Sequence, residues 1–229
     1  MLKVHAFLVK LPELSDEAFF AHWRHPHGTM TRRIPQFRRY VQNHGLGNPP
    51  AVPGFASGPW LGMPVIWVDD FEALAAANAH PNYPELDADA DEMYVRSELA
   101  WSIGQEIVLT PQAAGAATMP VKALLLLKAG PAAIDEPALR SLLCRLRDLL
   151  PERTGLRATL PGSAEAAGPF DAIVEISFDD RARFDAAWGD GAAIAAEVNR
   201  IADPDGTKAM LAREERVIWP DDATGGEQA

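Results

Sequence analysis

Hydrophobic and polar residues along this chain follow two periodicities, a period of two that is typical of strands and a period near 3.6 that is typical of helices. In the first half they predict a strand, a helix, two strands, a helix and a final strand, over residues 2–9, 16–24, 37–43, 63–68, 71–78 and 106–109. The second half repeats this order over residues 121–127, 137–150, 156–160, 172–178, 182–199 and 216–219. The pattern therefore predicts an internal repeat.

Residue identities at matching places support this duplication. A strand ending in WVDD at Asp70 precedes one predicted helix of the first half, and a strand ending in SFDD at Asp180 precedes its counterpart in the second. The segment EIVLTP at Glu106 matches ERVIWP at Glu215 in the same way. A strand-helix-strand-strand-helix-strand unit is the ferredoxin-like arrangement, an antiparallel sheet with two helices on one face.

The other face of each predicted sheet carries no helix. Its apolar side chains need a second sheet to pack against, and the other repeat is the nearest one. We expect an α+β fold in which two ferredoxin-like βαββαβ repeats form a two-sheet barrel within one chain, with pairing of each repeat in a homodimer as the alternative. The expected parts are a first repeat at 1–111, a linker at 112–120, a second repeat at 121–220 and a disordered tail at 221–229.

Composition narrows the classes of partner. The formal net charge is -11 and no large basic cluster interrupts it, which excludes nucleic acid as an expected partner. The apolar runs are far shorter than the roughly 20 residues that cross a bilayer, and the N-terminus lacks the pattern of a secretion signal. We therefore expect no membrane partner. Because Cys144 is the single cysteine and no intrachain disulfide can form, we expect a reducing compartment and a cytoplasmic location.

The side chains suited to proton transfer are unevenly distributed. All six histidines and all three tyrosines lie in the first half of the chain. Imidazole is the group best matched to proton transfer near neutral pH. We therefore expect the active site in the first repeat and a structural role for the second.

The densest histidine cluster is FFAHWRHPHGTM at residues 19–30. Ser15 is expected to cap the preceding helix and Pro26 to stop it, which places His27 in a loop just past the helix end. Period-two alternation sorts the residues of the next strand into two sets, of which one faces the barrel interior: Tyr40, Gln42 and His44, or Arg39, Val41 and Asn43.

The segment LSDEAFFAHWRHPHG followed by IPQFRRYVQNH resembles the opening of the EthD family, with a Phe-x-x-x-Trp helix, a histidine after it and a Pro-x-x-Arg-x-Tyr strand ending in Asn-His. The resemblance implies an α+β barrel and activity as a cofactor-independent decarboxylase or dehydratase, or as an accessory protein of ether degradation. It places His27 and Tyr40 at the positions of the family histidine and tyrosine. Gly28 and Thr29 stand where the family usually has Ala-Pro.

We therefore predict a lyase or isomerase without a cofactor that moves protons on a small hydrophobic or aromatic substrate. His27 would be the general acid or base, while Tyr40 and His44 would orient the substrate or stabilise an enolate. The alternative for His27 is a structural histidine packed at a helix end. Further residues expected to bind substrate are His22, Trp23, Asn43, Trp60 and Trp67, with Trp60 in a Gly- and Pro-rich loop that would either cover the pocket or lie on the surface.

Three competing hypotheses follow from the same residues. The H-x-x-H-x-H spacing offers three nitrogens to a metal, but Pro26 splits them between a helix and a loop, so we expect no metal site. A non-catalytic protein that binds a hydrophobic ligand or supports a degradation pathway is a second. The resemblance to the EthD family also implies the dimeric α+β barrel superfamily, and a cofactor-less or haem-linked monooxygenase of that superfamily is a third.

Overall fold

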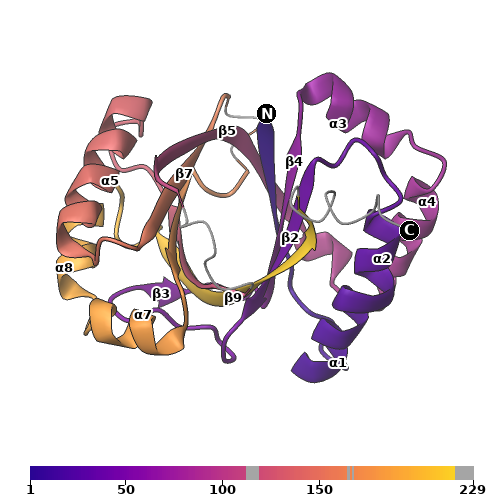
Figure 1. The fold of residues 1–229 in the computed structure, drawn as a ribbon, viewed down its shortest axis with the longest axis horizontal. Coiled ribbons are helices and arrows are strands. Elements are labelled where there is room, and N and C mark those ends of the chain that lie inside the picture. Colours follow the sequence, from indigo (N-terminus) through magenta and orange to yellow (C-terminus); the bar gives the residue numbers. More distant parts are fainter. Residues whose placement is uncertain (112–118, 164–165, 167, 220–229) are drawn as a thin grey trace, which may run out of the picture.

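The computed structural model describes residues 1–111, 119–163, 166 and 168–219. Eight of the nine strands in its sheet close into a barrel, because β2 pairs with β9 at the ends of the strand order. Helices cover the outside of the barrel on two opposite flanks (Figure 1). The predicted α+β barrel within one chain is confirmed. Residues 112–118 of the predicted linker and the predicted tail lie outside the described residues.

The first half supplies four barrel strands, a short fifth strand and one helical flank. Its strands are β1 (Leu2–Phe7), β2 (Arg39–Gly45), β3 (Ala56–Ser57), β4 (Gly62–Val68) and β5 (Ala100–Thr110). Its helical segments are α1 (Asp16–His22), a wide π-type turn (Trp23–His27), α2 (Gly28–Thr31), α3 (Phe71–Asn78), α4 (Tyr83–Asp89) and two 3-10 turns (Ala90–Glu92 and Arg96–Glu98).

The second half supplies the other four barrel strands and the other flank. Its strands are β6 (Val121–Leu127), β7 (Gly155–Pro161), β8 (Ala172–Phe178) and β9 (Lys208–Ile218). Its helices are α5 (Glu136–Leu149), α7 (Arg181–Trp188) and α8 (Ala192–Val198).

The strand order is the same in both halves. It runs β5-β1-β4-β2 in the first and β9-β6-β8-β7 in the second, which is the ferredoxin-like order of fourth, first, third and second strand. The two sheets join at β5–β7 and at β2–β9, both antiparallel. The last strand of each half thus pairs with the second strand of the other, so the barrel closes with approximate two-fold symmetry.

Strand β1 has two buried faces. On β1, Val4 and Ala6 pack toward the helices, whereas Lys3 and His5 contact the second half across the barrel interior. The Lys3 ammonium pairs with Glu175 and lies 2.8 Å from Glu106. Burial raises the pKa of the Glu175 carboxyl, but the nearby Lys122 and Lys3 charges outweigh it and hold that pKa well below its usual range.

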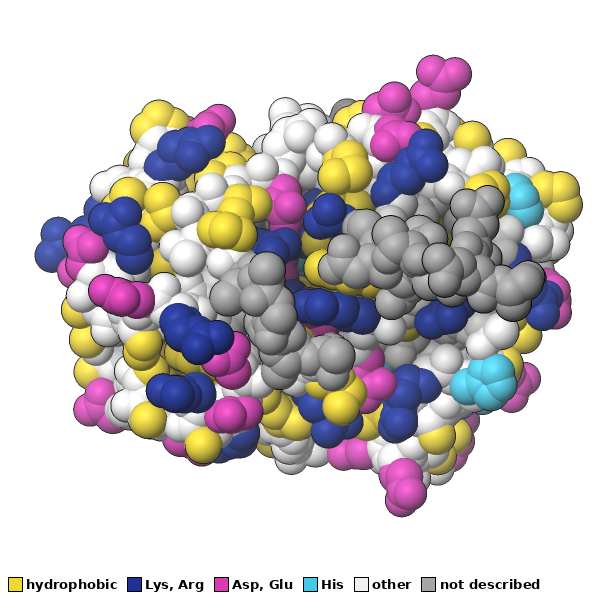
Figure 2. Space-filling model, viewed as in Figure 1, with side chains coloured by type: hydrophobic (Ala, Val, Ile, Leu, Met, Phe, Trp, Pro, Cys, Tyr) yellow, Lys and Arg dark blue, Asp and Glu magenta, His cyan; other side chains and the backbone are white. Residues whose placement is uncertain are grey.

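Positively charged side chains are unevenly distributed over the surface (Figure 2). The chain is acidic overall, with a formal charge of -11. Figure 2 nevertheless shows Lys and Arg side chains gathered near the centre of the face onto which the barrel opens. Arg157 lies 3.5 Å from Glu106 and Arg216 lies 3.0 Å from Glu214, so these two cations compensate carboxylates of the barrel.

Several predicted boundaries are corrected. The helix expected at 182–199 is two helices, because Gly189 and Gly191 between them have positive φ angles of 59° and 76°. The strand expected at 216–219 begins at Lys208 and extends across most of the barrel. The sequence predicts no helix at 83–89, where the structure has α4, and the acidic run at residues 87–91 spans the end of α4 and the turn after it.

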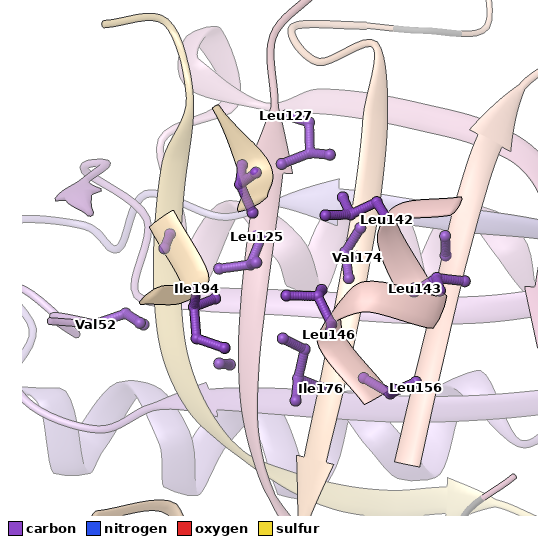
Figure 3. Close-up of a cluster of buried hydrophobic side chains, with 14 of the residues drawn as sticks. Val52, Leu125, Leu127, Leu142, Leu143, Leu146, Leu156, Val174, Ile176 and Ile194 are labelled. Atoms are coloured by element: carbon purple, nitrogen blue, oxygen red, sulfur yellow. The ribbon is translucent and has the colours of Figure 1, made fainter. Parts of the chain in front are cut away.

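The second half is filled by aliphatic side chains. Helix α5 buries Leu139, Leu142, Leu143 and Leu146 against the outer faces of β6, β7 and β8 (Figure 3). Helix α8 adds Ile194 to the same cluster. This flank is therefore a continuous apolar core between helices and sheet.

Candidate active site

The corresponding space in the first half is open. A cavity of about 370 Å³ lies between the outer faces of β1, β4 and β5 and the helical segments of the first half. Short side chains such as Ala6 and Ala90 line it, where longer ones would fill it. All three tyrosines of the chain, Tyr40, Tyr83 and Tyr94, also line it, together with His27. The cavity thus gathers proton-carrying groups inside largely apolar walls, as expected of a small-molecule site.

His27 is placed by a break in the helix. Ser15 caps α1, its hydroxyl accepting a hydrogen bond from the Ala18 backbone N–H at 3.0 Å. At His25 the backbone is extended (φ -154°, ψ 116°), and the chain becomes helical again before Gly28. His27 therefore takes the N-cap position of α2, with helical backbone angles, rather than a position in a loop past the helix end.

The His27 ring is held by a carboxylate. Its Nδ1 lies 2.8 Å from Asp89 Oδ2 at the end of α4. Burial lowers the pKa of His27, and the bond to Asp89 offsets part of that effect. The imidazole is therefore neutral at pH 7, with Nδ1–H donated to Asp89 and Nε2 left as a proton acceptor. No hydrogen bond among the described residues engages Nε2.

Tyr40 is a protonated phenol with a fixed orientation. Its oxygen accepts hydrogen bonds from Trp23 Nε1 at 3.0 Å and from Gln42 Nε2 at 3.1 Å. Burial raises its pKa, so the hydroxyl keeps its proton. Because both acceptor positions are occupied, that proton is available to the Thr31 hydroxyl, which contacts Tyr40, or to a ligand oxygen.

Two further tyrosines and an arginine complete the cavity. Burial raises the pKa of Tyr94 to about 12 and also raises that of Tyr83. The Arg96 guanidinium lies 5.7 Å from the Tyr94 ring centre and pairs with Asp87 at 2.7 Å and Asp91 at 2.6 Å. These contacts tie the segment after α4 to the rim of the cavity.

His44 lies apart from the cavity. Its ring is stacked between Phe20 and Trp23, with centroid distances of 4.5 Å and 4.9 Å, and its Nε2 lies 3.0 Å from Gln42 Oε1. Burial lowers its pKa to about 3, so it stays neutral. His44 supports Gln42 and Trp23 and has no direct approach to a ligand in this cavity.

Three of the residues expected to bind substrate point to the other side of the sheet. Asn43 donates to the Met63 carbonyl at 2.9 Å, and Trp67 packs under the Lys3 ammonium at 4.7 Å. Trp60 packs on Phe7 and Phe170 at 5.3 Å and 5.4 Å rather than covering the cavity. Of the set predicted for substrate binding, Trp23 lines the cavity.

The other two histidines of the cluster, His22 and His25, have different partners. His22 Nε2 lies 2.9 Å from Asp89 Oδ1, behind the cavity wall, and His25 Nδ1 lies 2.6 Å from the exposed Thr29 hydroxyl. Across the described ranges, no group of three or more metal-ligating side chains is arranged to hold an ion.

Sequence reasoning missed Asp89, Tyr83, Tyr94 and Thr31. Asp89 lies in the run DADAD, which has the composition of a solvated surface. The restriction of all tyrosines to the first half was the one available signal, since all three line this cavity.

Comparison with known proteins bears on the same region. The EthD domain family model matches residues 11–97, a span that contains both His27 and Asp89. Residues 11–97 therefore match an EthD domain. The resemblance found in residues 14–44 is thereby confirmed and extended through α4.

Solved structures agree on the fold. An EthD family protein from Bacillus halodurans C-125 is 26% identical and aligns over 47% of this chain and 99% of its own, with a TM-score of 0.38. An anthrone oxidase-like protein aligns over 94% of this chain and 92% of its own, at 12% identity and a TM-score of 0.60. A proposed monooxygenase from Fusobacterium nucleatum aligns over 93% and 91%, at 11% identity and a TM-score of 0.57. The last two show that the barrel made by both halves is shared.

Two searches found nothing, one among curated proteins and one among the helices of this structure. No curated protein matches the chain. Among the helices that the structure describes, none has the length and apolarity needed to cross a bilayer.

Proposed function

We propose that the EthD-domain cavity binds a small, largely apolar ring-bearing metabolite and that His27 moves a proton on it without a cofactor. The observation that carries this proposal is the Asp89–His27 pair at the cavity wall. A carboxylate on Nδ1 fixes the tautomer and stabilises the imidazolium that forms when Nε2 takes a proton.

Tyr40 supplies the complementary group. A hydroxyl that keeps its proton and is held by two donors can donate to a carbonyl oxygen of the substrate. When His27 removes a proton next to that carbonyl, negative charge develops on the oxygen, and the hydrogen bond from Tyr40 strengthens. Decarboxylation, dehydration and isomerisation next to a carbonyl all pass through such an enolate, so the site supports this class of reaction.

The proposal is tested with a panel of aromatic and alicyclic ketones and β-keto acids. The wild-type protein is incubated with each compound in D₂O, and exchange of the proton next to the carbonyl is followed by NMR alongside release of carbon dioxide. We expect exchange or turnover of at least one compound, and its loss in His27→Ala. Equal rates in the variant would refute the role of His27.

A ligand-binding role without catalysis is the second candidate, favoured by the apolar character of the cavity walls. Native mass spectrometry of the purified protein separates the two. A retained metabolite together with no exchange across the panel would favour binding alone.

A further inference from the structure

Asp89 is bracketed by two imidazoles. Its Oδ2 meets His27 Nδ1 at 2.8 Å and its Oδ1 meets His22 Nε2 at 2.9 Å. The side chains of His27 and Asp89 are 13% and 10% exposed, whereas that of His22, which does not line the cavity, is 30% exposed. One carboxylate therefore connects the cavity histidine with a second histidine on the solvent side.

The helix break makes this geometry. In an uninterrupted α-helix, side chains five positions apart point about 140° away from each other, which would separate His22 from His27. The extended backbone at His25 reorients the chain between them, so that both rings reach the same carboxylate of α4. The break thus creates a contact between His22 and Asp89 in addition to placing His27.

We propose that His22 is a positioning residue for His27 and acts through Asp89. An N–H donated by His22 fixes the carboxylate plane and competes for its negative charge. Both effects determine how strongly Asp89 attracts the His27 N–H and any proton that Nε2 accepts. This inference rests on the proposed function for its effect on catalysis, but its effect on the His27 ring exists without substrate.

The electrostatic surroundings agree with this role. Burial and the Asp89 contact dominate the pKa of His27, and the charges of His22 and Arg96 lower it further. Besides these groups, His27 shares the cavity with Asp87 and with the three phenols Tyr40, Tyr83 and Tyr94. Among all these charged and titratable neighbours of His27, His22 is the one that also contacts the carboxylate of Asp89.

The test uses the full chain, with NMR of ¹⁵N-labelled histidine rings and, once a substrate is known, kcat/KM over pH. His22→Phe removes the donor and the charge, His22→Gln keeps an N–H donor, and His25→Phe is the matched control because His25 bonds to Thr29 instead. In His22→Phe we expect the His27 titration midpoint to rise and kcat/KM to fall about tenfold, a small part of the roughly 10²–10⁴-fold contribution of a general base.

His22→Gln should restore most of the kcat/KM, and His25→Phe should leave both readouts unchanged. A His27 midpoint that is the same in His22→Phe and wild type, with both folded by circular dichroism, would overturn the inference even if His27 proves essential for turnover. A shifted midpoint in a protein that turns over no compound would support the inference while the proposed enzymatic function fails.

Discussion

The two halves of this barrel have the same strand order but differ in how the space between helices and sheet is filled. In the second half, α5 fills the space above the sheet with leucines. In the first half, a broken helix and alanines at Ala6 and Ala90 leave a cavity of about 370 Å³ lined by a histidine and three tyrosines. One ferredoxin-like unit thus has a filled core under its helices, while its copy encloses a cavity. The difference lies in side-chain volume and helix continuity.

The largest expected effect is on catalysis through Asp89. Asp89→Asn replaces the acceptor of the His27 N–H by an amide and allows the wrong tautomer, so kcat/KM should fall by roughly 10²–10⁴-fold. The matched control is Asp185→Asn, an exposed carboxylate of the second half paired with Arg181 at 2.7 Å, which should keep full activity. A comparable loss of kcat/KM in the two variants would contradict the assignment of catalysis to the first half and of a structural role to the second.

The next effect is on stability in the second half. Leu143→Ala removes a fully buried side chain from the leucine cluster and should lower the free energy of unfolding by about 2–5 kcal/mol. Urea unfolding measures this loss, and activity measured well below the new midpoint should be unchanged. Loss of kcat without loss of stability would show that the second half takes part in the chemistry.

Acid should destabilise the protein through histidines of the first half. Burial lowers the pKa of both His5 and His44 to about 3, below the ordinary value of 6.5. As pH falls below 6.5 the unfolded chain binds protons that the folded chain does not, so stability decreases. Each histidine contributes up to about 1.4 kcal/mol per pH unit.

Urea unfolding at pH 6.5 and pH 5 checks this slope above the range in which ordinary glutamates titrate. His44→Phe preserves a ring between Phe20 and Trp23 and should reduce the slope by about one proton. An unchanged slope in that variant would show that His44 binds a proton equally in the folded and the unfolded chain.

A smaller effect on the free energy of unfolding is expected when a larger side chain is introduced into either half of the barrel. Ala6→Leu in the first half should occupy the cavity at little cost in stability and weaken ligand binding. Ala123→Leu, in the packed second half, should cost about 1–3 kcal/mol through overpacking and leave ligand binding intact. The reverse pattern of unfolding energies would mean that the two interiors are equally filled.

The sequence predicts the repeat well because each strand and helix carries its own periodicity, and WVDD and SFDD mark equivalent corners. It sorts Tyr40 and Val41 onto opposite faces of β2 but does not say which faces the helices, since both are buried, at 2% and 0% exposure. In the structure the Tyr40 set faces the helices and Val41 packs with Trp67 inside the barrel.

The partner of His27 was not predictable for a different reason. Asp89 is distant from the histidines in the chain, and the turn that brings them together depends on the break at His25 and on the packing of α4. Local sequence patterns carry no information on that contact. His22 was expected to bind substrate. In the structure its Nε2 lies 2.9 Å from Asp89 Oδ1, a contact that depends on the same break.

The central claim is that the cavity of the first half, and not the filled core of the second, receives the ligand beside a neutral His27. It is tested most directly by titrating 1-naphthol, an apolar aromatic with one hydroxyl, into the protein labelled with ¹⁵N and ¹³C at pH 7. We predict shifts of the His27 ring and of the tyrosine resonances, a His27 ring in the Nδ1–H form, and no shift of Leu142, Leu143 or Leu146. Shifts confined to the leucine cluster, or a protonated His27 at that pH, would contradict the account.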